Sequence, residues 1–265
     1  MRSLLVVALC VLVGSATADR KSQATLDALG HSFGGSGEKL PLIALADSDT
    51  KLAPTEPVYD AMQIDWDPLD PKVAFAADGS ASWIAAGLMD TQICGMEGCE
   101  KIVAKARRDA ERKPPYHATA LVDGDQPIVL HVGSTGAGVG HGAAMTAQID
   151  DAANDAVKLF ESTIGDPSVF AATVSTRKDV VLFGTEATER FIGGDVVRAT
   201  LVKWGLSFAT VGGIRAGTTK SKTVAWVAAD VDARAKKATK PAPYRLTVIY
   251  EKTGANWRIV QIHFS

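Results

Sequence analysis

Hydrophobic residues recur at three- and four-residue steps just past the middle of the chain, which predicts an amphipathic helix over 147–161. A Gly-Asp-Pro sequence at 165–167 ends that helix, and 168–174 fits a second, shorter one. The apolar segment 179–184 predicts a strand, and 195–204 predicts a third helix that begins after two glycines.

Three more apolar segments follow, at 222–230, 243–251 and 257–264, and each predicts a strand. Helices therefore come first in this half of the chain, and an antiparallel meander comes last. That order predicts an α+β layered architecture and argues against a parallel α/β sheet.

The N-terminus has the three zones of a secretory signal peptide over residues 1–18. One positive charge at Arg2 precedes an apolar run over 4–13, and an Ala-x-Ala site ends at Ala18. The apolar run is too short to span a bilayer as a stop-transfer helix. We therefore expect cleavage near Ala18 and an exported protein, periplasmic or secreted, with no membrane anchor once the signal is removed.

Glycine and proline divide the rest of the chain. Residues 19–57 are expected to be a flexible segment. A glycine-rich linker over 134–145 separates an abbreviated N-terminal α+β domain, 58–133, from a C-terminal domain, 146–265. The linker lacks the residue order of a phosphate-binding loop, so it predicts no nucleotide site.

A weak repeat relates the two halves of the chain. The matched segments, in order, are 82–87 with 225–230, 115–120 with 243–248, and 128–131 with 260–263. Duplication of a Trp-bearing strand and the hairpin after it would explain three matches in one order, and chance similarity among apolar strands is the alternative. The N-terminal copy carries an insert over 90–113, which contains a cysteine loop and a charged helical run.

Charge and cysteine content exclude some classes of partner. A net charge of -2 provides no broad basic field for binding nucleic acid. Cys94 and Cys99 flank a short glycine-containing loop, and in an oxidising compartment this pair predicts one disulfide, with free thiols as the alternative. No second cysteine pair or nearby histidine completes a metal set, so we expect neither a metal nor a cofactor.

The C-terminal half resembles the SnoaL-like families of the nuclear-transport-factor-two-like superfamily. The resemblance rests on 181–185, which leads through 189–191 to a Gly-Gly helix start, and on the strand at 226–230. Its most specific element is the terminal strand, 256–265. It covers nearly all of 146–265, whereas the N-terminal half matches only through the repeat.

This resemblance implies a strongly bent antiparallel sheet wrapped around helices, which together form a cone with a cavity inside. Relatives include ketosteroid-isomerase-like enzymes, polyketide cyclases, epoxide hydrolases and non-catalytic binding domains. The fold therefore implies a pocket and leaves its chemistry open. The enzymes of the superfamily use an ionisable group inside the cone, usually an aspartate that acts as a base.

The last strand supplies the first candidate site residue. Two-residue alternation places His263 on the same face as Trp257, Ile259 and Gln261. His263 is then either a polar group in the cavity or a strand-end histidine tied to the backbone.

Arg245 on the preceding strand is the second candidate. It lies opposite His263 if the intervening turn has a three-residue loop, and opposite Ile262 if the loop has two residues. In the first register the pair would form a corner that binds carboxylates. A solvated arginine is the alternative.

Asp230 ends the Trp226 strand and is a candidate general base if it faces inward, although acids at strand ends are more often solvated. The matched position in the N-terminal half is Gly87. Trp204, Trp226 and Tyr244 are expected in the core or in the wall of the cavity.

These observations favour a non-catalytic module that binds a small, largely apolar ligand or mediates assembly. The ligand would be acidic if the arginine–histidine corner forms. The ligand-binding candidates are Arg245, His263, Tyr244, Trp226 and Trp204. The alternative is an isomerase- or cyclase-like enzyme that uses Asp230 or His263. In a third, purely structural hypothesis, open sheet faces pair between the two halves or between chains by self-association.

Overall fold

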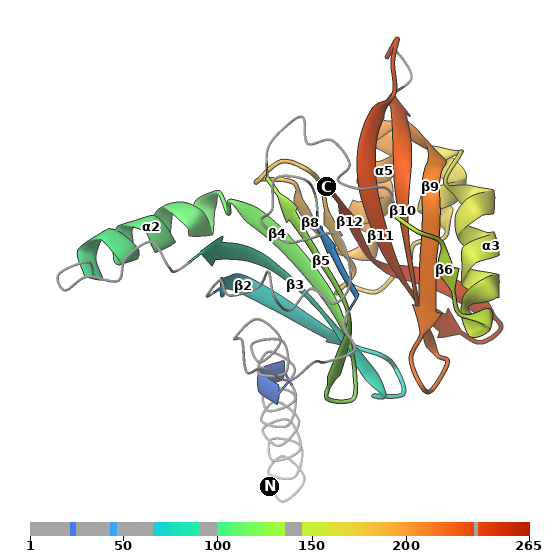
Figure 1. Cartoon of the computed structure of the whole chain (residues 1–265), viewed down its shortest axis with the longest axis horizontal. Coiled ribbons are helices and arrows are strands. Elements are labelled where there is room, and N and C mark those ends of the chain that lie inside the picture. Colours follow the sequence, from blue (N-terminus) through green and yellow to red (C-terminus); the bar gives the residue numbers. More distant parts are fainter. Residues whose placement is uncertain (1–21, 25–42, 47–65, 91–99, 136–144, 236–237) are drawn as a thin grey trace, which may run out of the picture.

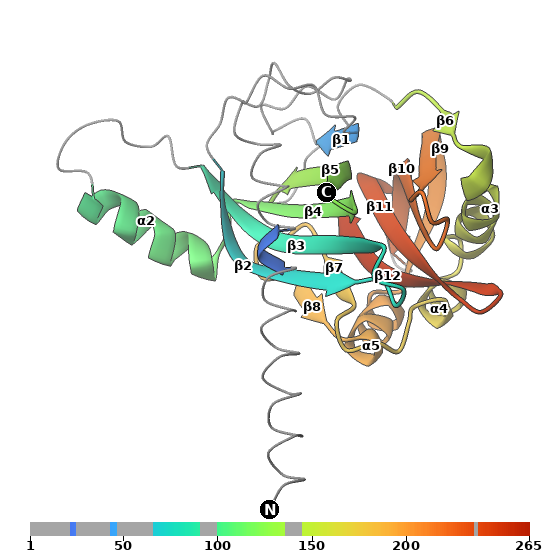
Figure 2. The ribbon, with the colours of Figure 1, turned by 90° about the horizontal axis from the view of Figure 1, so that it is seen from below.

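A computed structural model of the chain shows two β-sheets packed face to face, with helices on the far side of one of them (Figures 1 and 2). Within the part of the chain that the structure describes, no helix is long and apolar enough to cross a membrane. The described residues are 22–24, 43–46, 66–90, 100–135, 145–235 and 238–265.

The C-terminal sheet is 7-stranded, in the order β6-β9-β10-β11-β12-β7-β8. Its pairs are antiparallel except β6 with β9 and β12 with β7, which are parallel. The strands are β6 (Gln148–Ile149), β7 (Val181–Phe183), β8 (Arg190–Ile192), β9 (Leu206–Thr218), β10 (Val224–Ala235), β11 (Ala242–Thr253) and β12 (Asn256–Phe264). One face is covered by η2 (Asp151–Ala153), α3 (Asn154–Thr163), α4 (Pro167–Ala172) and α5 (Gly194–Trp204).

The N-terminal sheet is 5-stranded, in the order β1-β5-β4-β3-β2. Only β1 and β5 pair in parallel. The strands are β1 (Ile43–Ala46), β2 (Trp66–Phe75), β3 (Ala81–Asp90), β4 (Tyr116–Asp123) and β5 (Gln126–Ser134). Helix α2 (Glu100–Arg112) lies in the predicted insert and projects from the side of the molecule away from α3 (Figure 1).

Local sequence signals set the ends of the C-terminal helices. The Asp166 carboxylate accepts hydrogen bonds from the backbone N–H groups of Ser168 and Val169 (2.8 and 3.1 Å), and Pro167 occupies the first turn of α4. Gly205 ends α5 in the left-handed region, with φ 59. The predicted elements of this half are confirmed, except that the helix predicted over 147–161 begins only at Asn154, because Gln148–Ile149 form β6 and Asp151–Ala153 form η2.

Strand β9 is an element that the sequence did not predict. It contains Gly212, Gly213 and Gly217, and its buried positions do not alternate. The pairing of β9 with β10 shifts register between Ala229 and Val231. Because this irregularity breaks the two-residue period, the usual sequence pattern of a strand is absent.

A β-bulge in β12 changes which side chains share a face. The register of β11 and β12 skips Val260. As a result Gln261 and His263 face the N-terminal sheet, whereas Ile259 and Trp257 pack against the core under the helices. The expectation that the last four odd-numbered positions share one face is therefore wrong.

The same bulge decides the neighbour of Arg245. Its backbone N–H donates to the Ser265 carbonyl, and the Ser265 N–H donates back (2.8 and 3.0 Å). His263 pairs with Thr247. Neither register derived from the loop length, with His263 or Ile262 opposite Arg245, is formed. The turn lies later than assumed, with Thr253 paired to Asn256, and the bulge then adds one more residue of shift.

An apolar layer joins the two sheets. Trp83, Leu121 and Val129 of the N-terminal sheet pack with Trp226 and Ile249 of the C-terminal sheet, and each is at most 4% exposed. Burial of each such side chain contributes about 1.5–3 kcal/mol. The open faces of the two sheets thus pair within one chain.

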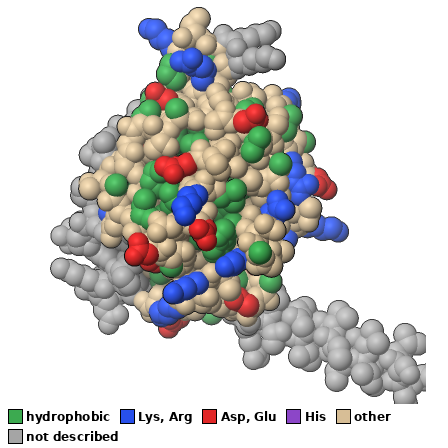
Figure 3. Space-filling view, turned by 90° about the vertical axis from the view of Figure 1, so that its right-hand side faces the viewer, with side chains coloured by type: hydrophobic (Ala, Val, Ile, Leu, Met, Phe, Trp, Pro, Cys, Tyr) green, Lys and Arg blue, Asp and Glu red, His purple; other side chains and the backbone are tan. Residues whose placement is uncertain are grey.

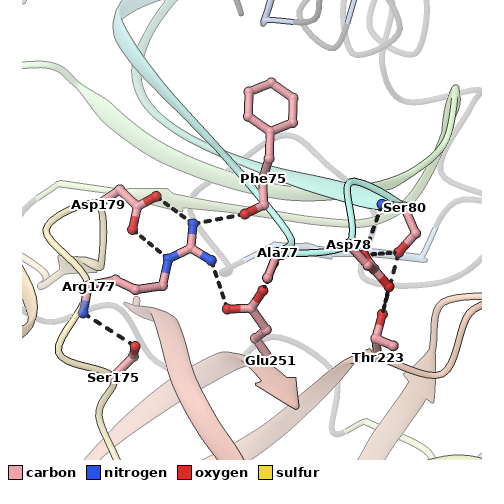
Figure 4. A network of polar contacts seen from close by, with 9 residues as sticks. All are labelled: Phe75, Ala77, Asp78, Ser80, Ser175, Arg177, Asp179, Thr223 and Glu251. Carbon is pink, nitrogen blue, oxygen red and sulfur yellow. Dashed lines mark hydrogen bonds and ion pairs between the residues drawn. The ribbon is translucent and has the colours of Figure 1, made fainter. Parts of the chain in front are cut away.

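Arg177 connects the two sheets beside this layer (Figure 4). Its Nε and Nη2 donate to the two carboxylate oxygens of Asp179 (2.8 and 2.6 Å), and Nη1 donates to Glu251 (2.7 Å). Nη2 also donates to the carbonyl of Phe75 in the N-terminal sheet (2.8 Å), and the guanidinium lies 5.1 Å from the centre of the Trp83 ring. One side chain therefore binds both halves.

Replacing this arginine tests its contribution to stability. We expect Arg177→Ala to lower the free energy of unfolding by about 2–4 kcal/mol, because it leaves the buried Glu251 carboxylate without its charged partner and removes a donor from the Phe75 carbonyl. Arg177→Lys should recover only part of the loss, since an ammonium lacks the planar fork. The measurement is urea unfolding.

The matched control is Lys105→Ala, which removes an exposed pair with Asp109 on α2. That change should cost less than about 1 kcal/mol. Equal losses for Arg177→Ala and Lys105→Ala would contradict the assignment of Arg177 as the connection between the sheets.

Candidate functional site

A pocket of about 180 Å³ opens on the helix-covered side of the C-terminal sheet. Its lining is mostly apolar and comes from α5, β9, β11, β12 and the loop after β7. The lining residues are Gly184, Thr185, Glu189, Trp204, Leu206, Phe208, Tyr244 and Phe264.

Aromatic contacts hold the apolar part of the pocket. Phe208 stacks on Phe264 with ring centroids 5.2 Å apart, and Trp204 meets Phe264 edge-on at 6.3 Å. Phe191 in turn meets the edge of Trp204 at 5.5 Å. Because these rings contact one another in favourable offset and edge geometries, the wall is formed before any ligand arrives.

The polar groups of the lining are the hydroxyls of Thr185 and Tyr244 and the carboxylate of Glu189. Burial raises the pKa of Tyr244, and the nearby Glu189 charge raises it further. The Glu189 carboxylate accepts a hydrogen bond from the Glu186 N–H (3.1 Å). It also lies where a Cβ on Gly184 would collide with it, so a glycine is needed at that position.

The N-terminal sheet holds both ends of the 184–190 loop that forms one wall of the pocket. At one end, His117 Nδ1 is 3.2 Å from the carbonyl oxygen of Gly184, and the His117 ring stacks on Phe183 at 4.3 Å. At the other end, Arg190 donates to the carboxylate and the carbonyl of Asp70 (2.9 and 2.7 Å). The position of this wall therefore depends on the docking of the two sheets.

The backbone conformation and the ionisation of Asp70 both favour its contact with Arg190. Its φ of 44 places it in the left-handed region, which is unusual for a residue other than glycine. A hydrogen bond from Lys72 lowers the pKa of Asp70, and the charges of Arg190 and Lys72 add to this effect. The carboxylate is thus held ionised opposite Arg190.

The structure separates the ligand-binding residues that the sequence suggested. Tyr244 and Trp204 both line the pocket. Trp226 lies on the opposite face of the sheet, in the apolar layer against the N-terminal half. Arg245 and His263 also lie on that opposite face, so they do not form a corner of the pocket.

Arg245 forms a buried ion pair with Asp230. Its Nε donates to Asp230 Oδ1 at 2.9 Å, and both side chains are 2% exposed. The other carboxylate oxygen of Asp230 accepts a hydrogen bond from the Met145 N–H (3.0 Å). Asp230 therefore faces neither the pocket nor water, and both of its oxygens are occupied by protein donors.

His263 belongs to a group of histidines buried between the sheets. Its ring stacks on His131 with centroids 3.9 Å apart, and its Nδ1 is 3.2 Å from the Thr119 hydroxyl. His131 Nε2 is 2.8 Å from the Ser265 hydroxyl. Within the described ranges, no set of three His, Cys, Asp or Glu residues is arranged to hold a metal ion.

Burial keeps these histidines neutral. It lowers the pKa of His117 to about 4 and that of His131 to about 3, with the positive charge of Arg190 or Arg245 adding to the respective shift. Burial also lowers the pKa of His263. The histidines therefore act as uncharged packing and hydrogen-bonding groups near neutral pH.

A family model matches the part of the chain that carries the pocket. A family model described as a SnoaL-like domain matches residues 151–265, from η2 to the end of the sequence. Residues 151–265 are a SnoaL-like domain. The cone of curved sheet and helices that the resemblance implied is confirmed for this region. A comparison with curated proteins finds no match.

Solved structures with similarity to the chain cover a similar share of it. A candidate ketosteroid isomerase from Parabacteroides distasonis is 19% identical, over 42% of this chain and 83% of its own, with a TM-score of 0.35. An NTF2-like protein of unknown function from Pseudomonas putida is 15% identical over 42% and 82%, with a TM-score of 0.34. One from Shewanella oneidensis is 20% identical over 43% and 97%, with a TM-score of 0.33.

Some pocket residues were not found from the sequence. Glu189 was interpreted only as part of the approach to helix α5, because its turn toward the SnoaL-like pocket depends on the 184–190 loop. Leu206 and Phe208 lie on β9, which the sequence pattern did not reveal. The hydrophobic residues just after Gly205 were the available signal for a strand next to the pocket.

Other predictions fall on residues outside the described part of the chain. The signal peptide, Cys94 and Cys99 lie there, as does most of the glycine-rich linker. Their roles stay predictions. On the surface seen from the α3 side, basic and acidic side chains are interspersed with hydrophobic ones (Figure 3).

The buried histidines predict a loss of stability in mild acid. Their pKa values are lower in the folded protein than the ordinary 6.5, so the unfolded chain binds more protons below that pH. Stability should be constant above neutrality and fall as the pH drops below 6.5 toward the folded values near 4 and 3. At about pH 5, each of His117 and His131 should cost about 2 kcal/mol.

Urea unfolding at several pH values measures this effect. His131→Asn should lower stability at neutral pH, but it should reduce the difference between neutral pH and about pH 5 by roughly 2 kcal/mol. An unchanged pH dependence in that variant would show that His131 is not held neutral by burial.

Proposed function

We propose that this protein is exported and that its SnoaL-like domain binds a small, largely apolar molecule without catalysing a reaction. The supporting observation is the pocket whose walls are Trp204, Phe208 and Phe264 and whose polar groups are few. Pockets with apolar walls and a small number of placed polar groups are typical small-molecule sites. The sequence at residues 1–18 supports export.

The volume of the pocket limits the size of the ligand. A cavity of about 150 Å³ holds one benzene molecule. The pocket here measures about 180 Å³, so it fits one ring with a short substituent. A molecule with four fused rings would require the walls to move.

The charge of the lining favours a neutral ligand or one that donates hydrogen bonds. Glu189 supplies a carboxylate, and Thr185 and Tyr244 supply hydroxyls, whereas the described lining contains no basic side chain. An acidic ligand, which the arginine–histidine corner would have accommodated, meets like charge instead. The ligand class that fits is a single-ring alcohol or amine.

Two features favour binding over catalysis. Asp230 and His263, the acid–base candidates from the sequence, lie on the face away from the pocket. Asp230 is also committed to its ion pair with Arg245. Buried groups with these contacts do not reach a molecule in the pocket, and a general base must lie within hydrogen-bonding distance of the proton that it removes.

Catalysis is the second candidate function, and Glu189 is the observation that favours it. This carboxylate shares the pocket with Tyr244, which is the pairing of a base with a hydrogen-bond donor that proton-transfer chemistry uses. A turnover that Glu189→Gln abolishes, without changing the affinity for ligand, would support this function over binding alone.

Binding of simple probes tests the proposal. We expect the chain to bind benzyl alcohol more tightly than toluene, and benzoate most weakly, when titrated in a calorimeter or followed by NMR. Tyr244→Phe should weaken benzyl alcohol about three- to tenfold, equivalent to one hydrogen bond, and leave toluene unchanged. Tyr116→Phe on the N-terminal sheet is the matched control. Tighter binding of benzoate than of the alcohol, or equal effects of the two tyrosine variants, would refute the proposal.

The loop contacts predict that residues outside the pocket affect affinity. Arg190→Ala should weaken benzyl alcohol severalfold, because it frees one end of the 184–190 loop, while the free energy of unfolding changes by about 1 kcal/mol or less. Lys72→Ala is the control, since Lys72 pairs with the same Asp70 carboxylate at 2.8 Å but belongs to β2, as Asp70 does. If both variants bind the probe like the unmodified chain, the N-terminal sheet does not position the pocket.

A further inference from the structure

We propose that the outer face of the SnoaL-like sheet is a two-fold association surface, and that its partner is the N-terminal half of the same chain, a diverged second copy. The first observation is the order of the strands. The order β1-β5-β4-β3-β2 in one sheet corresponds to β7-β12-β11-β10-β9 in the other.

The directions of the strands agree as well. The edge strand β1 is parallel to β5, and β7 is parallel to β12. All other corresponding pairs are antiparallel in both sheets. A parallel strand added to the same edge of an antiparallel meander is a specific feature to find twice.

The register of the strands matches residue by residue. Trp83 pairs with Leu121 in one sheet, as Trp226 pairs with Ile249 in the other. These are the tryptophans that the sequence repeat aligns.

The next pair of strands matches in the same way. Thr119 pairs with His131, as Thr247 pairs with His263. The register also shifts at the same place, where β5 skips Ile128 and β12 skips Val260. The repeat in the sequence aligns Ile128 with Val260, so the two bulges are equivalent.

Polar contacts between the two sheets occur in equivalent pairs. The Asp123 carboxylate accepts from the Lys220 N–H at 2.8 Å, and the Glu251 carboxylate accepts from the Ala77 N–H at 2.6 Å. Asp123 and Glu251 occupy corresponding positions near the ends of β4 and β11. In a two-fold interface, a contact from one copy to the other must be accompanied by its reverse.

Reciprocal contacts also occur between the tips of the β2–β3 and β9–β10 hairpins. The Ser80 and Ser221 hydroxyls are 2.9 Å apart, and the Thr223 hydroxyl donates to Asp78 at 2.8 Å. Under the alignment of the two tryptophan strands, Asp78 corresponds to Ser221 and Ser80 to Thr223. Each contact is therefore the reverse of the other.

Residues that meet their own equivalents mark the axis. Ser80 and Thr223 are 3.4 Å apart at the hairpin tips. The His131 and His263 rings stack at 3.9 Å deeper in the interface. A residue contacts its own counterpart only near a two-fold axis, so the axis passes through these two places.

The two copies differ at the positions of the buried ion pair in the C-terminal copy. Asp230 and Arg245 are cross-strand partners in β10 and β11, and Gly87 and His117 occupy the corresponding positions in β3 and β4. A Cβ at Gly87 would collide with Pro114, which fills the space there. The interface is therefore two-fold in backbone and in many contacts, with one charged pair kept in one copy.

Because the second copy is part of the same chain, the outer face of the SnoaL-like sheet is not accessible to other partners. The apolar layer of the SnoaL-like sheet, including Trp226 and Ile249, is already covered by the N-terminal half. A second chain would have to displace that half to reach it. Two sheets of unrelated origin would not be expected to form reciprocal contacts between residues that the sequence repeat aligns.

Cysteine pairs in the full chain test the two-fold arrangement. One variant carries Ser80→Cys with Ser221→Cys, and the second carries Asp78→Cys with Thr223→Cys. The control carries Ser80→Cys with Ser162→Cys, because Ser162 lies on the distant helix α3. After mild oxidation, mass spectrometry of digests locates the linked peptides, and sedimentation gives the mass.

We expect both equivalent pairs to link within one chain, at the monomer mass of 27.8 kDa, while the control pair stays unlinked. Linkage of only one equivalent pair, or of neither in protein with unchanged circular dichroism, would overturn the two-fold relation. Linkage between two chains would show that the partner of the SnoaL-like sheet comes from another molecule. None of these outcomes depends on whether the pocket binds a ligand.

Discussion

The burial of both faces of the C-terminal sheet is the constraint on which the rest of the structure depends. Helices α3, α4 and α5 cover one face and the N-terminal sheet covers the other, so the middle of β10, β11 and β12 has no side open to water. Polar side chains on such strands must find partners inside the protein or remain uncharged. Asp230 and Arg245 satisfy this requirement by pairing, and His131 and His263 satisfy it by staying neutral.

This constraint gives the two faces of the SnoaL-like sheet different roles. Successive residues of a strand point to opposite faces. Tyr244 therefore lines the pocket, while its neighbour Arg245 is bonded between the sheets. Polar chemistry is concentrated on the association face, where ionisable groups are already occupied. The pocket keeps only Glu189 and two hydroxyls, which is why binding of a small molecule fits it better than acid–base catalysis.

The sequence predicted the α+β order, the C-terminal helices and the SnoaL-like domain because these depend on local periodicity and on a specific terminal strand. It also aligned the tryptophans that the structure places at corresponding positions of the two sheets. The sequence did not predict which face of the sheet His263 occupies. The bulge at Val260 inserts one extra residue and so reverses that face, and no local pattern reveals a bulge. The pocket role of Glu189 was equally hidden, since it depends on contacts between the 184–190 loop and residues distant in the sequence.

The docking of the two sheets and the shape of the pocket depend on the same contacts. Arg190 reaches Asp70, and His117 contacts Gly184, so a wall of the pocket is fixed by the half of the chain that does not line it. A ligand that requires this wall in place binds the docked state in preference to one with separated sheets. By thermodynamic linkage, ligand binding must stabilise the docked sheets by the same free energy by which docking strengthens ligand binding. The N-terminal half thus contributes to the site through the position that it imposes on the 184–190 loop.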